Sequence, residues 1–560
     1  MNKIKLTIFI GIFIFLILGK LPFGFSQDIH PPLKVPLVMS SSYCEPRPGH
    51  FHTGVDYKTQ GRVGLGLFSI LDGDLYRMKI SPFGYGLVLY VLHHDTCMSV
   101  YAHMDGFRSD IAEFAEKLQY ENQGFFLDTI FSDAPFSFEK GELIGYGGST
   151  GHSFGPHLHF EMRKWPSENV INAQNYFPMT DNIAPDFFSI VMYDVDRPDL
   201  SEKNRATRYV VTGSGNNYRR GDLSLPTGNW AVGAEIKDRM TGTHNRYGVL
   251  EVKAFVNNLL IYHSEIDELD WKDNRIFETW FDTYYLEEKS QYIQRCFREA
   301  GNDSEMLLHV ENDGLIQLKS GETKAIKIRA RDAAGNWSEC NFKIVASDSD
   351  KQIPKMNVLA YNKPQIVIGE GFFLEIPANA MYRDGFINLS VEKSAKYGKM
   401  WNFNDAWFAF VKPYKLALDG SEIPGEYHDK ALLMWTRDGK RRQVSGKWQT
   451  PYYTVEYDKP GSFYFEIDTV APKIHGGFKD SVSLSYGKKI FYRISDNLSG
   501  IKSYNAWIDD EWVLLKYKPK SCKVSYEIDD KIKKSQWHNW KIRVEDAKGN
   551  ATESSFVFYY

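Results

Sequence analysis

The histidines that can carry chemistry gather in three short motifs near the N-terminus. The motifs are His52-x-x-x-Asp56, Tyr101-Ala-His103 and His157-x-His159. In the third motif, Leu158, Phe160 and Met162 alternate with the histidines. On a β-strand this alternation places both imidazoles on one face and the apolar side chains on the other. The motif therefore predicts a strand that presents two imidazoles to one site and is held rigid by the core beneath it.

The first motif predicts a loop that leads into a strand. Gly54 lies between His52 and Asp56, and prolines precede the motif, so a helix is not expected. Two histidines and one carboxylate form a catalytic zinc set, with three protein ligands and an open fourth position for water. A structural zinc site is more often closed by four ligands rich in cysteine, and these motifs contain none.

A zinc set of this kind is suited to hydrolysis. The ion lowers the pKa of its bound water to about 7 and polarises a scissile carbonyl group. Near neutral pH, the natural general base or cationic hydrogen-bond donor is histidine. His157 and His103 can fill these two roles without a catalytic glutamate. Each motif alone is common in proteins, so the prediction depends on the whole set, its order and its surroundings.

The set and its surroundings resemble the LytM/lysostaphin-type zinc metallopeptidases. The resemblance covers roughly residues 45–165 and rests on these segments: His52-Thr-Gly-Val-Asp56, Asp72-Gly-Asp-Leu75, Gly84-Tyr-Gly86 with Val88, Tyr101-Ala-His-Met104, Lys140-Gly-Glu-Leu-Ile-Gly-Tyr-Gly-Gly-Ser-Thr-Gly151 and Gly155-Pro-His-Leu-His-Phe-Glu161. The last of these segments is the most specific.

The resemblance implies a role for each residue of the set. It makes His52, Asp56 and His159 the ligands of Zn²⁺. His157 becomes the catalytic histidine that contacts and activates the water, and His103 stabilises the tetrahedral oxyanion or relays a proton. The implied fold is a compact antiparallel β core with a groove over the zinc. The implied substrate class is peptidoglycan cross-links or bridges.

Other polar residues near the motifs have less defined roles. His50 is expected at the rim of the groove. Glu161 either orients a ligand from behind or forms an ordinary ion pair. Glu45 and Arg47 are expected to form an ion pair, either near the groove or as an ordinary pair at the surface. No role is assigned to His93, His94 or His152.

Residues 105–138 form an insertion relative to the simplest pattern of that family. Asp110-x-x-Glu113 predicts a capping box at the start of a helix. Apolar residues recur at helical spacing: Ile111, Phe114, Ala115 and Leu118. Glu113 and Lys117 are expected to form an i,i+4 pair. The insertion therefore predicts a short amphipathic helix, which either walls the groove or serves only as a packing element.

The composition indicates a globular, mostly β chain. Hydrophobic residues make up 43% of the 560 residues and aromatic residues 15%, and short alternating stretches favour strands. The length predicts about three to five domains. The net charge of -4 provides no basic field for nucleic acid.

The N-terminus predicts export. Lys3 and Lys5 precede an apolar run over residues 6–18, and Gly24 and Ser26 supply small residues for a signal peptidase. Cleavage after Ser26 would release the protein to the periplasm, the cell surface or the medium, and no second long apolar stretch predicts a membrane span. An uncleaved N-terminal anchor is the alternative.

The cysteines suggest no metal or redox motif. They stand at irregular positions without a C-x-x-C motif. An oxidising compartment allows one or two disulfides. Cys296–Cys340 is the pairing we predict, because both residues lie in one predicted domain. At least one of the five cysteines is expected to stay free or to pair between chains.

An internal repeat organises the second half of the chain. Lys327-Ile-Arg-Ala-Arg-Asp-Ala-Ala-Gly-Asn336 matches Lys541-Ile-Arg-Val-Glu-Asp-Ala-Lys-Gly-Asn550, and Asp181-Asn-Ile-Ala-Pro185 matches Asp468-Thr-Val-Ala-Pro472. Both copies resemble bacterial immunoglobulin-like sandwiches, and the first carries a partly helical insertion around 255–320. The predicted domains are a signal peptide at 1–26, a zinc metallopeptidase domain at 27–180, an immunoglobulin-like domain at 181–350, a β-sandwich weakly resembling ZU5-type domains at 351–467, and an immunoglobulin-like domain at 468–560.

The predicted function is that of an exported zinc metalloendopeptidase acting on peptidoglycan, with an N-terminal antiparallel β metallopeptidase domain followed by β-sandwich domains. The C-terminal sandwiches are expected to bind the wall or a protein partner, or to act as spacers. Three alternatives stay open. The chain could cut a secreted or surface protein, activate other wall hydrolases as a non-catalytic LytM-like regulator, or act as an adhesin, although the last leaves the N-terminal motifs unexplained.

Overall fold

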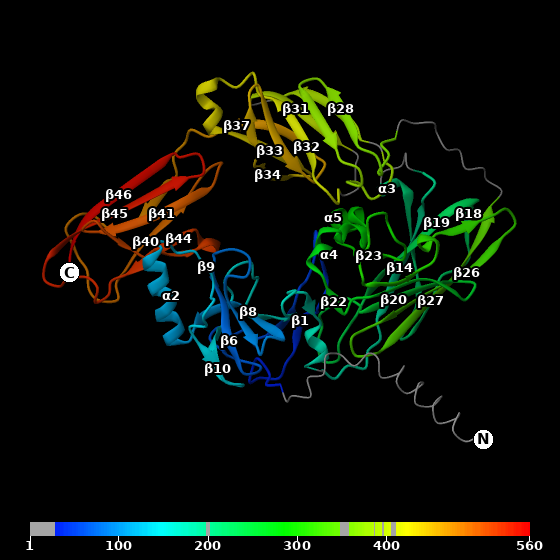
Figure 1. Ribbon diagram of the computed structural model, residues 1–560, viewed down its shortest axis with the longest axis horizontal. Helices are drawn as coiled ribbons and strands as arrows, with labels where there is room; N and C mark the ends of the chain where they lie inside the picture. Colours follow the sequence, from blue (N-terminus) through cyan, green and yellow to red (C-terminus); the bar gives the residue numbers. More distant parts are fainter. Residues whose placement is uncertain are drawn as a thin grey trace.

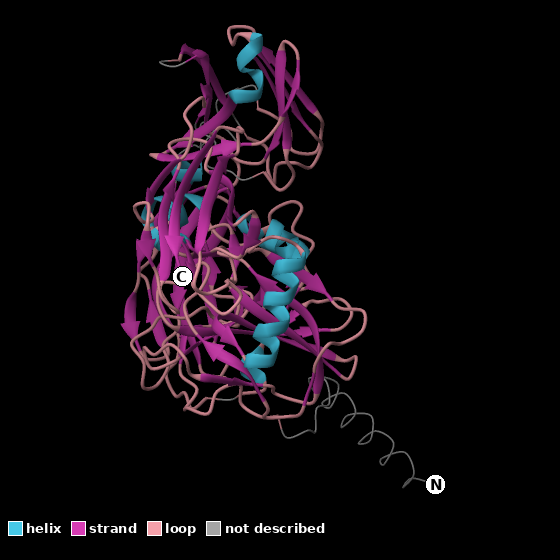
Figure 2. Cartoon of the chain, turned by 90° about the vertical axis from the view of Figure 1, so that its left-hand side faces the viewer, coloured by secondary structure: helices cyan, strands magenta, loops and turns pink. Residues whose placement is uncertain are grey.

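The computed structural model describes residues 29–177, 179–197, 202–347, 358–385, 387–394, 397–404 and 410–560. The predicted signal peptide lies outside the described residues. The chain is mostly β, as predicted, with a few short helices (Figure 2). Its β-rich segments follow one another around a ring, so that the C-terminal segment lies beside the N-terminal one (Figure 1). Within the described ranges, no helix is both long and apolar enough to cross a membrane.

The N-terminal segment forms a large antiparallel sheet. Its main path runs through β1 (Met39–Ser41), β4 (Val55–Lys58), β12 (His157–Lys164), β8 (Cys97–Phe107), β7 (Leu87–His93), β6 (Gly73–Ile80) and β10 (Ser137–Phe138). Shorter strands extend it: β5 (Gly66–Phe68), β9 (Leu127–Ile130), β11 (Leu143–Gly147), β13 (Val170–Ile171) and β22 (Glu268–Leu269). A separate small hairpin joins β2 (Pro46–Arg47) to β3 (His50–Phe51).

The strand predicted from the third histidine motif is confirmed as β12. Leu158, Phe160 and Met162 of β12 are fully buried in the core beneath the sheet. Because side chains alternate along a strand, this anchoring fixes His157 and His159 on the opposite face. The strand lies between β4 and β8, so its backbone is paired on both sides.

The hydrophobic core beneath this sheet also contains residues from the helical stretch around 271–289. The Phe51 ring lies 5.0 Å from the Phe277 ring and 6.1 Å from the Trp280 ring, measured between centroids. These partners belong to the helical stretch with α4 (Trp271–Arg275), η2 (Phe277–Thr279) and α5 (Thr283–Lys289). That stretch lies in the predicted insertion of the first repeat, and its neighbour β22 pairs with β13. The insertion therefore supports the loop that leads to His52.

The helix predicted in the 105–138 insertion is confirmed as α2 (Ser109–Glu121), but its details differ. Ile111 and Ala115 are buried, as the apolar spacing predicts. The predicted capping box is wrong, because the helix begins one residue before Asp110 and has no side-chain cap. Asp110 instead forms an ion pair with Arg108. The i,i+4 ion pair of Lys117 on this helix is with Glu121 rather than with Glu113.

The first repeat packs one sheet on another. One sheet contains β15 (Ala206–Val210), β14 (Asp186–Asp194), β19 (Gly228–Lys237), β23 (Ile293–Arg295) and β25 (Ile316–Leu318). The other contains β16 (Thr212–Ser214), β17 (Asn217–Arg219), β18 (Leu223–Pro226), β27 (Trp337–Ser347), β26 (Thr323–Arg331), β20 (Glu251–Val256), β21 (Leu259–Glu265) and β24 (Leu307–Val310). Two short helical turns, α3 (Glu202–Arg205) and η3 (Asn312–Gly314), complete this segment.

The predicted Cys296–Cys340 disulfide is wrong. All five cysteines are free thiols. Cys296 and Cys340 are both completely buried in the apolar core between these sheets. Burial raises the pKa of both thiols to about 12. They therefore behave as small apolar core groups rather than as reactive thiolates.

The remaining segments are also paired sheets. The middle one contains β28 (Gln365–Gly369), β29 (Phe372–Ile376), β32 (Tyr414–Asp419), β36 (Tyr452–Tyr457) and β35 (Lys447–Gln449), packed on β30 (Asn388–Lys393), β31 (Tyr397–Asn404), β37 (Ser462–Ile467), β33 (Ala431–Arg437) and β34 (Lys440–Val444), with η4 (Gly425–Lys430). The last contains β38 (Lys473–Gly476), β40 (Lys489–Ser495), β44 (Lys523–Glu527) and β43 (Lys516–Lys518), packed on β39 (Val482–Ser483), β46 (Ala551–Tyr559), β45 (Trp537–Asp546), β41 (Ile501–Ile508) and β42 (Glu511–Val513), with η5 (Pro519–Ser521).

The two repeats share their strand pairings. In the first, β14 pairs with β19, β20 with β26, and β26 with β27. In the last, β38 pairs with β40, β41 with β45, and β45 with β46. The matched sequence segments therefore occupy corresponding strands and turns.

The ring closes where the last sandwich meets α2. The Tyr120 and Trp512 rings lie 5.4 Å apart between centroids. Lys531 forms an ion pair with Glu116, and its Nζ lies 4.1 Å from the centroid of the Tyr120 ring. Figure 1 shows α2 beside β40 and β44. Of the two roles predicted for the insertion, this contact favours packing.

Candidate metal centre and active site

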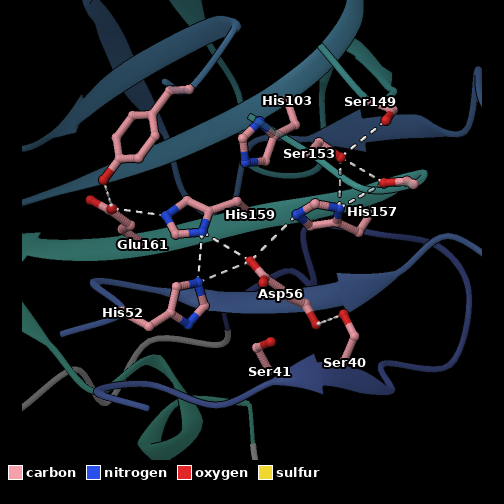
Figure 3. Close-up of polar contacts among 12 residues, drawn as sticks. Ser40, Ser41, His52, Asp56, His103, Ser149, Ser153, His157, His159 and Glu161 are labelled. Atoms are coloured by element: carbon pink, nitrogen blue, oxygen red, sulfur yellow. Dashed lines mark hydrogen bonds and ion pairs between the residues drawn. The ribbon is translucent and has the colours of Figure 1, made fainter. Parts of the chain in front are cut away.

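Two neighbouring strands place a carboxylate beside an imidazole. Asp56 on β4 and His159 on β12 lie directly opposite each other in the antiparallel pairing, and such cross-strand partners share a face of the sheet. Asp56 Oδ1 lies 2.9 Å from His159 Nδ1, and Figure 3 shows the two side chains pointing toward each other. The register of β4 against β12 therefore fixes half of the centre.

His52 joins this pair from the turn between β3 and β4. Its Nε2 lies 3.1 Å from Asp56 Oδ1 and 3.0 Å from His159 Nδ1. Gly54 lets the turn lie close against β12, because a Cβ there would stand 2.5 Å from the carbonyl oxygen of Phe160. One oxygen and two nitrogens therefore converge on one point.

Hydrogen bonds behind the two histidines fix which nitrogen faces that point. His52 Nδ1 lies 2.8 Å from the Ser42 carbonyl oxygen. A carbonyl can only accept, so Nδ1 carries the hydrogen and Nε2 presents its lone pair. His159 Nε2 lies 2.9 Å from Glu161 Oε1 and donates to it, which leaves the Nδ1 lone pair facing Asp56. Such outer partners are what metal-binding histidines usually have.

Glu161 is the buried anchor of this outer shell. It is completely buried, and Arg163 Nε donates to its Oε2 at 2.7 Å. Thr53 Oγ1 donates to its Oε1 at 2.6 Å, and the Tyr85 hydroxyl donates to the same oxygen. Of the two roles predicted for Glu161, the contacts support both, because it orients His159 and also forms a buried ion pair with Arg163.

The centre requires a positive charge among its ligand atoms. Burial raises the pKa of Asp56, but His52 and His159 outweigh it and hold that pKa well below its usual value. Burial lowers the pKa of His159, but Asp56 and Glu161 outweigh it and raise that pKa to about 9. A proton on His159 therefore supplies the charge unless a metal ion replaces it. Two nitrogens and one carboxylate oxygen fit zinc with an open coordination position.

A local irregularity in β8 turns His103 toward the centre. The pairing of β7 with β8 shifts register between Leu87 and Leu89, and His103 has a φ of 56°. Bulges with strained backbone of this kind re-aim side chains and are frequent at functional sites. His103 Nδ1 donates to the Thr150 carbonyl oxygen at 2.8 Å. Its Nε2 is therefore the nitrogen with a free lone pair.

His157 lies beside both groups. Its ring centroid is 4.8 Å from that of His103, and its Nε2 lies 3.6 Å from Asp56 Oδ1. Its Nδ1 donates to the Gly155 carbonyl oxygen at 2.8 Å. In Figure 3, His103, His157 and His159 lie on the same side of the sheet. The structure thus brings together all five residues predicted from the three motifs.

Burial sets the charge of His103. Its burial, together with the neighbouring His159 and His157, lowers the pKa of His103 to about 3. The imidazole is therefore neutral at physiological pH. With Nδ1–H held by Thr150, the neutral ring presents a proton acceptor at Nε2.

The last sandwich reaches the rim of this centre. Lys520 Nζ donates to the Ser149 carbonyl oxygen at 2.9 Å. The Ser149 hydroxyl lies 3.0 Å from that of Ser153, whose oxygen lies 3.3 Å from His157 Nδ1. A chain of two hydroxyl groups therefore joins a C-terminal lysine to His157. Nothing in the sequence spacing indicated this contact, because 371 residues separate its partners.

The other polar residues behave largely as predicted. Arg47 lies 3.5 Å from Glu45 and also 3.9 Å from Asp56. His50 and His152 are exposed at the rim. The motifs did not single out Ser42 or Arg163, although Arg163 continues the alternation that places His159 and Glu161 on one face.

Comparisons with known proteins support the N-terminal assignment. The chain is 31% identical over 129 residues to the DD-carboxypeptidase/endopeptidase Mpg of Neisseria meningitidis and to that of Neisseria gonorrhoeae. The match covers 23% of this chain and 22% of those relatives, so the chain spans about a fifth of the length of the curated relatives it matches. The resemblance inferred from the motifs is confirmed.

Two solved structures share a similar segment with this chain. The catalytic domain of the M23 protein EnpA from Enterococcus faecalis is 26% identical, with 26% of this chain and 95% of that domain covered and a TM-score of 0.20. The catalytic domain of lysostaphin from Staphylococcus simulans is 20% identical, with 25% and 90% covered and a TM-score of 0.19. A Zu5-like domain matches residues 356–468, where the sequence resembled ZU5-type domains.

Proposed function

We propose that the chain is an exported zinc metalloendopeptidase that cuts peptide bonds in peptidoglycan cross-links. The observation that carries this proposal is the convergence of His52 Nε2, Asp56 Oδ1 and His159 Nδ1 within 3.1 Å of one another. The peptidoglycan substrate follows from the motif resemblance and from relatives named DD-carboxypeptidase/endopeptidase. Export to the periplasm or beyond follows from the N-terminal signal pattern.

In this proposal His52, Asp56 and His159 hold Zn²⁺. The ion would lower the pKa of a water molecule and polarise the scissile carbonyl. Glu161 and the Ser42 carbonyl hold the two imidazoles in the tautomers that leave the correct nitrogen free. Arg163 compensates the charge of Glu161, so Glu161 remains a carboxylate and keeps accepting from His159.

His157 and His103 handle protons in this proposal. His157 holds Nδ1–H against Gly155, so its Nε2 can accept a proton from the attacking water. Two roles were open for His103, oxyanion stabilisation and proton relay. A neutral ring with an unprotonated Nε2 cannot donate to an oxyanion from that atom, so the geometry and low pKa support proton relay.

The C-terminal segments have a proposed supporting role. We propose that residues 181–350 and 468–560 are immunoglobulin-like modules and that 351–467 is a Zu5-like module. Together they would hold the peptidase domain at the wall or bind a protein partner. These segments are arranged in a ring with the N-terminal sheet, so the last sandwich lies beside it (Figure 1).

The test is a paired digestion of purified peptidoglycan by residues 27–560. Bound zinc is measured in wild type and in His157→Ala, and products are identified by mass. We expect about one zinc per chain in both, and a rate in His157→Ala reduced by about 10²–10⁴-fold. The control is His152→Ala, since His152 is exposed at the same rim and should leave the rate unchanged.

Each result of this test separates the alternatives. Zinc with no release of peptide from peptidoglycan would favour a protein substrate, which a digest of surface proteins would then reveal. A chain with neither zinc nor cleavage would contradict the enzyme proposal and favour a non-catalytic regulator.

A further inference from the structure

Each repeat contains a cluster of three aspartates at the end where the preceding segment enters it. In the first repeat the cluster is Asp181, Asp238 and Asp332, whose carboxylate oxygens lie within 4.8 Å of one another. Asp181 precedes β14, Asp238 follows β19, and Asp332 follows β26. Three strand ends therefore bring three carboxyl groups to one point. Like charges this close repel strongly unless a cation lies among them.

The last repeat has the same cluster at the same positions. It consists of Asp468, Asp496 and Asp546, again with oxygens within 4.8 Å. Asp496 follows β40, the counterpart of β19, and Asp546 ends β45, the counterpart of β26. Both repeats thus keep an acidic triplet at one junction.

The hydrogen bonds around the two clusters also correspond. Asn336 Nδ2 donates to Asp332 Oδ2 at 2.9 Å and to the Asp181 carbonyl oxygen at 3.2 Å. In the last repeat, Asn550 Nδ2 donates to Asp546 Oδ2 at 2.7 Å and to the Asp468 carbonyl oxygen at 3.1 Å. These bonds orient the carboxylates of Asp332 and Asp546 and tie them to the backbone of Asp181 and Asp468, but they leave the central aspartate of each cluster incompletely paired.

The central aspartate carries an orphaned oxygen in both repeats. Asp238 is 95% buried, with 5% of its surface exposed, and its Oδ1 has no hydrogen-bond partner. The corresponding Oδ1 of Asp496 is also buried and unpaired. A buried carboxylate oxygen without a partner is costly and calls for a ligand. The recurrence of the same unpaired atom at equivalent positions makes an accident of packing a poor explanation.

These aspartates have no ion-pair partner among the described residues, although Lys548 interacts electrostatically with Asp468 and Asp546 in the last repeat. Among the described residues, no Lys or Arg forms an ion pair with any of the six. A third acidic cluster, Glu251 with His263 and Glu265, shows the contrast. There Arg331 pairs with both glutamates and Lys253 pairs with Glu251. That cluster has ion-pair partners for its carboxylates, whereas the described residues provide none for the aspartate clusters.

We propose that Asp181, Asp238 and Asp332 bind a calcium ion, and that Asp468, Asp496 and Asp546 form an equivalent but weaker site. Ca²⁺ prefers six to eight oxygen ligands in flexible loops, and carboxylates with nearby carbonyls supply them. Zinc prefers nitrogen or sulfur, which these clusters lack. The second site is weaker because Asp496 is less buried and Lys430 Nζ donates to Asn550 Oδ1 at 2.7 Å beside it.

Calcium at these positions would fix the junctions of the ring. Asp181 lies on the segment that joins the N-terminal sheet to β14, and Asp468 lies between β37 and β38. An ion that holds this segment to two strand ends would set the angle between neighbouring sandwiches. Burial, together with the carboxylates of Asp332 and Asp181, raises the pKa of Asp238 to about 9. Without calcium, Asp238 therefore stays protonated at neutral pH.

The test compares wild type, Asp238→Asn and Asp496→Asn in residues 27–560, loaded with zinc and otherwise stripped of metal. Isothermal titration with CaCl₂ should give about two sites in wild type and one in each variant, with the tighter site lost in Asp238→Asn. MgCl₂ should bind more weakly. Asp222→Asn is the matched control, since Asp222 is an exposed aspartate of the same repeat.

The melting temperature decides between a calcium site and a merely protonated carboxyl group. If calcium binds, Asp238→Asn should melt higher than wild type in EGTA, because the buried acid is gone, and lower than wild type in calcium. This reversal is the expected result. An Asp238→Asn variant that is more stable than wild type in both conditions, or that still binds calcium at two sites, would overturn the proposal. If Asp238→Asn folds poorly, calcium binding and the melting temperature of Asp496→Asn provide an independent test.

Discussion

The N-terminal centre and the aspartate clusters each bring three polar side chains to one point, yet their surroundings differ in kind. At Asp56, two imidazoles present their nitrogen atoms and can carry the compensating proton. At Asp238, the neighbours are two further carboxylates, and no base is available. The first arrangement suits a metal that activates water, and the second suits one that only holds oxygens together.

The difference extends to what lies behind each group. Both imidazoles of the N-terminal centre are oriented by an outer partner, Glu161 behind His159 and the Ser42 carbonyl behind His52. In the first repeat, Asp181 and Asp332 are oriented by Thr241 and Asn336, whereas Asp238 Oδ1 is left free. A catalytic metal must be held in a defined geometry, while calcium tolerates adjustable ligands. The comparison therefore predicts two metals with separate chemistry in one chain.

The largest expected effect is that of His159→Ala. Loss of this ligand should remove zinc and reduce cleavage to the uncatalysed rate, because two remaining ligands hold the ion poorly. Calcium binding should be unaffected. Metal analysis and calorimetry on one sample measure both outcomes. A variant that loses calcium along with zinc would show that the N-terminal centre and the aspartate clusters are not independent.

Glu161→Gln should have the next largest effect. The amide can still meet His159, but it no longer compensates the buried Arg163. Outer-shell changes of this kind weaken metal affinity by about 10–100-fold. Zinc affinity is measured by competition with a chromogenic chelator. Glu168→Gln is the matched control, since Glu168 also pairs with Arg163 but lies away from the centre. Equal affinities in the two variants would contradict the role of Glu161.

Part of this architecture could be predicted from the sequence. The alternation in His157–Met162 is local, and local alternation determines a strand and its buried face. The five residues of the centre were found because their motifs are dense and ordered. The outer shell was only partly visible, since Ser42 contributes its backbone carbonyl, which any residue carries. The contact between Lys520 and Ser149 could not be predicted, because nothing local encodes how distant sandwiches meet.

The two repeats also show that sequence motifs predict local turns but not how distant residues come together. Matching Asp-x-x-Gly-Asn segments revealed two copies, and the turn residues alone explained those aspartates. The cluster that could bind a metal ion forms only in the folded chain, where Asp181 and Asp332 come together with Asp238. The prediction of a Cys296–Cys340 disulfide was wrong because two cysteines in the same domain need not have the distance and orientation that a disulfide requires.

The pH dependence of stability should separate the metal-free and calcium forms. An acid whose folded pKa is about 9 binds its proton more tightly in the folded state than at its usual value near 3.8. Asp238 therefore destabilises the metal-free chain progressively as the pH rises from 4 to about 9. Thermal melts in EGTA should show this decline relative to Asp238→Asn, and melts in calcium should not. An identical pH profile for wild type and variant in EGTA would contradict the burial argument.

The smallest effect expected is that of Lys520→Ala, which tests whether the two regions communicate around the ring. Lys520 belongs to the sandwich that follows Asp468, and it donates to Ser149 beside the histidines. Because the lysine is exposed, its contact should contribute no more than about 1 kcal/mol, so cleavage should change by less than about fivefold. Lys518→Ala is the matched control, since Lys518 lies on the neighbouring strand. Calcium should alter the rate of wild type but not of Lys520→Ala if the second cluster positions this lysine. A calcium response of equal size in both proteins would mean that the sandwich influences the centre by another route, or that the ion acts at the wall rather than on the enzyme.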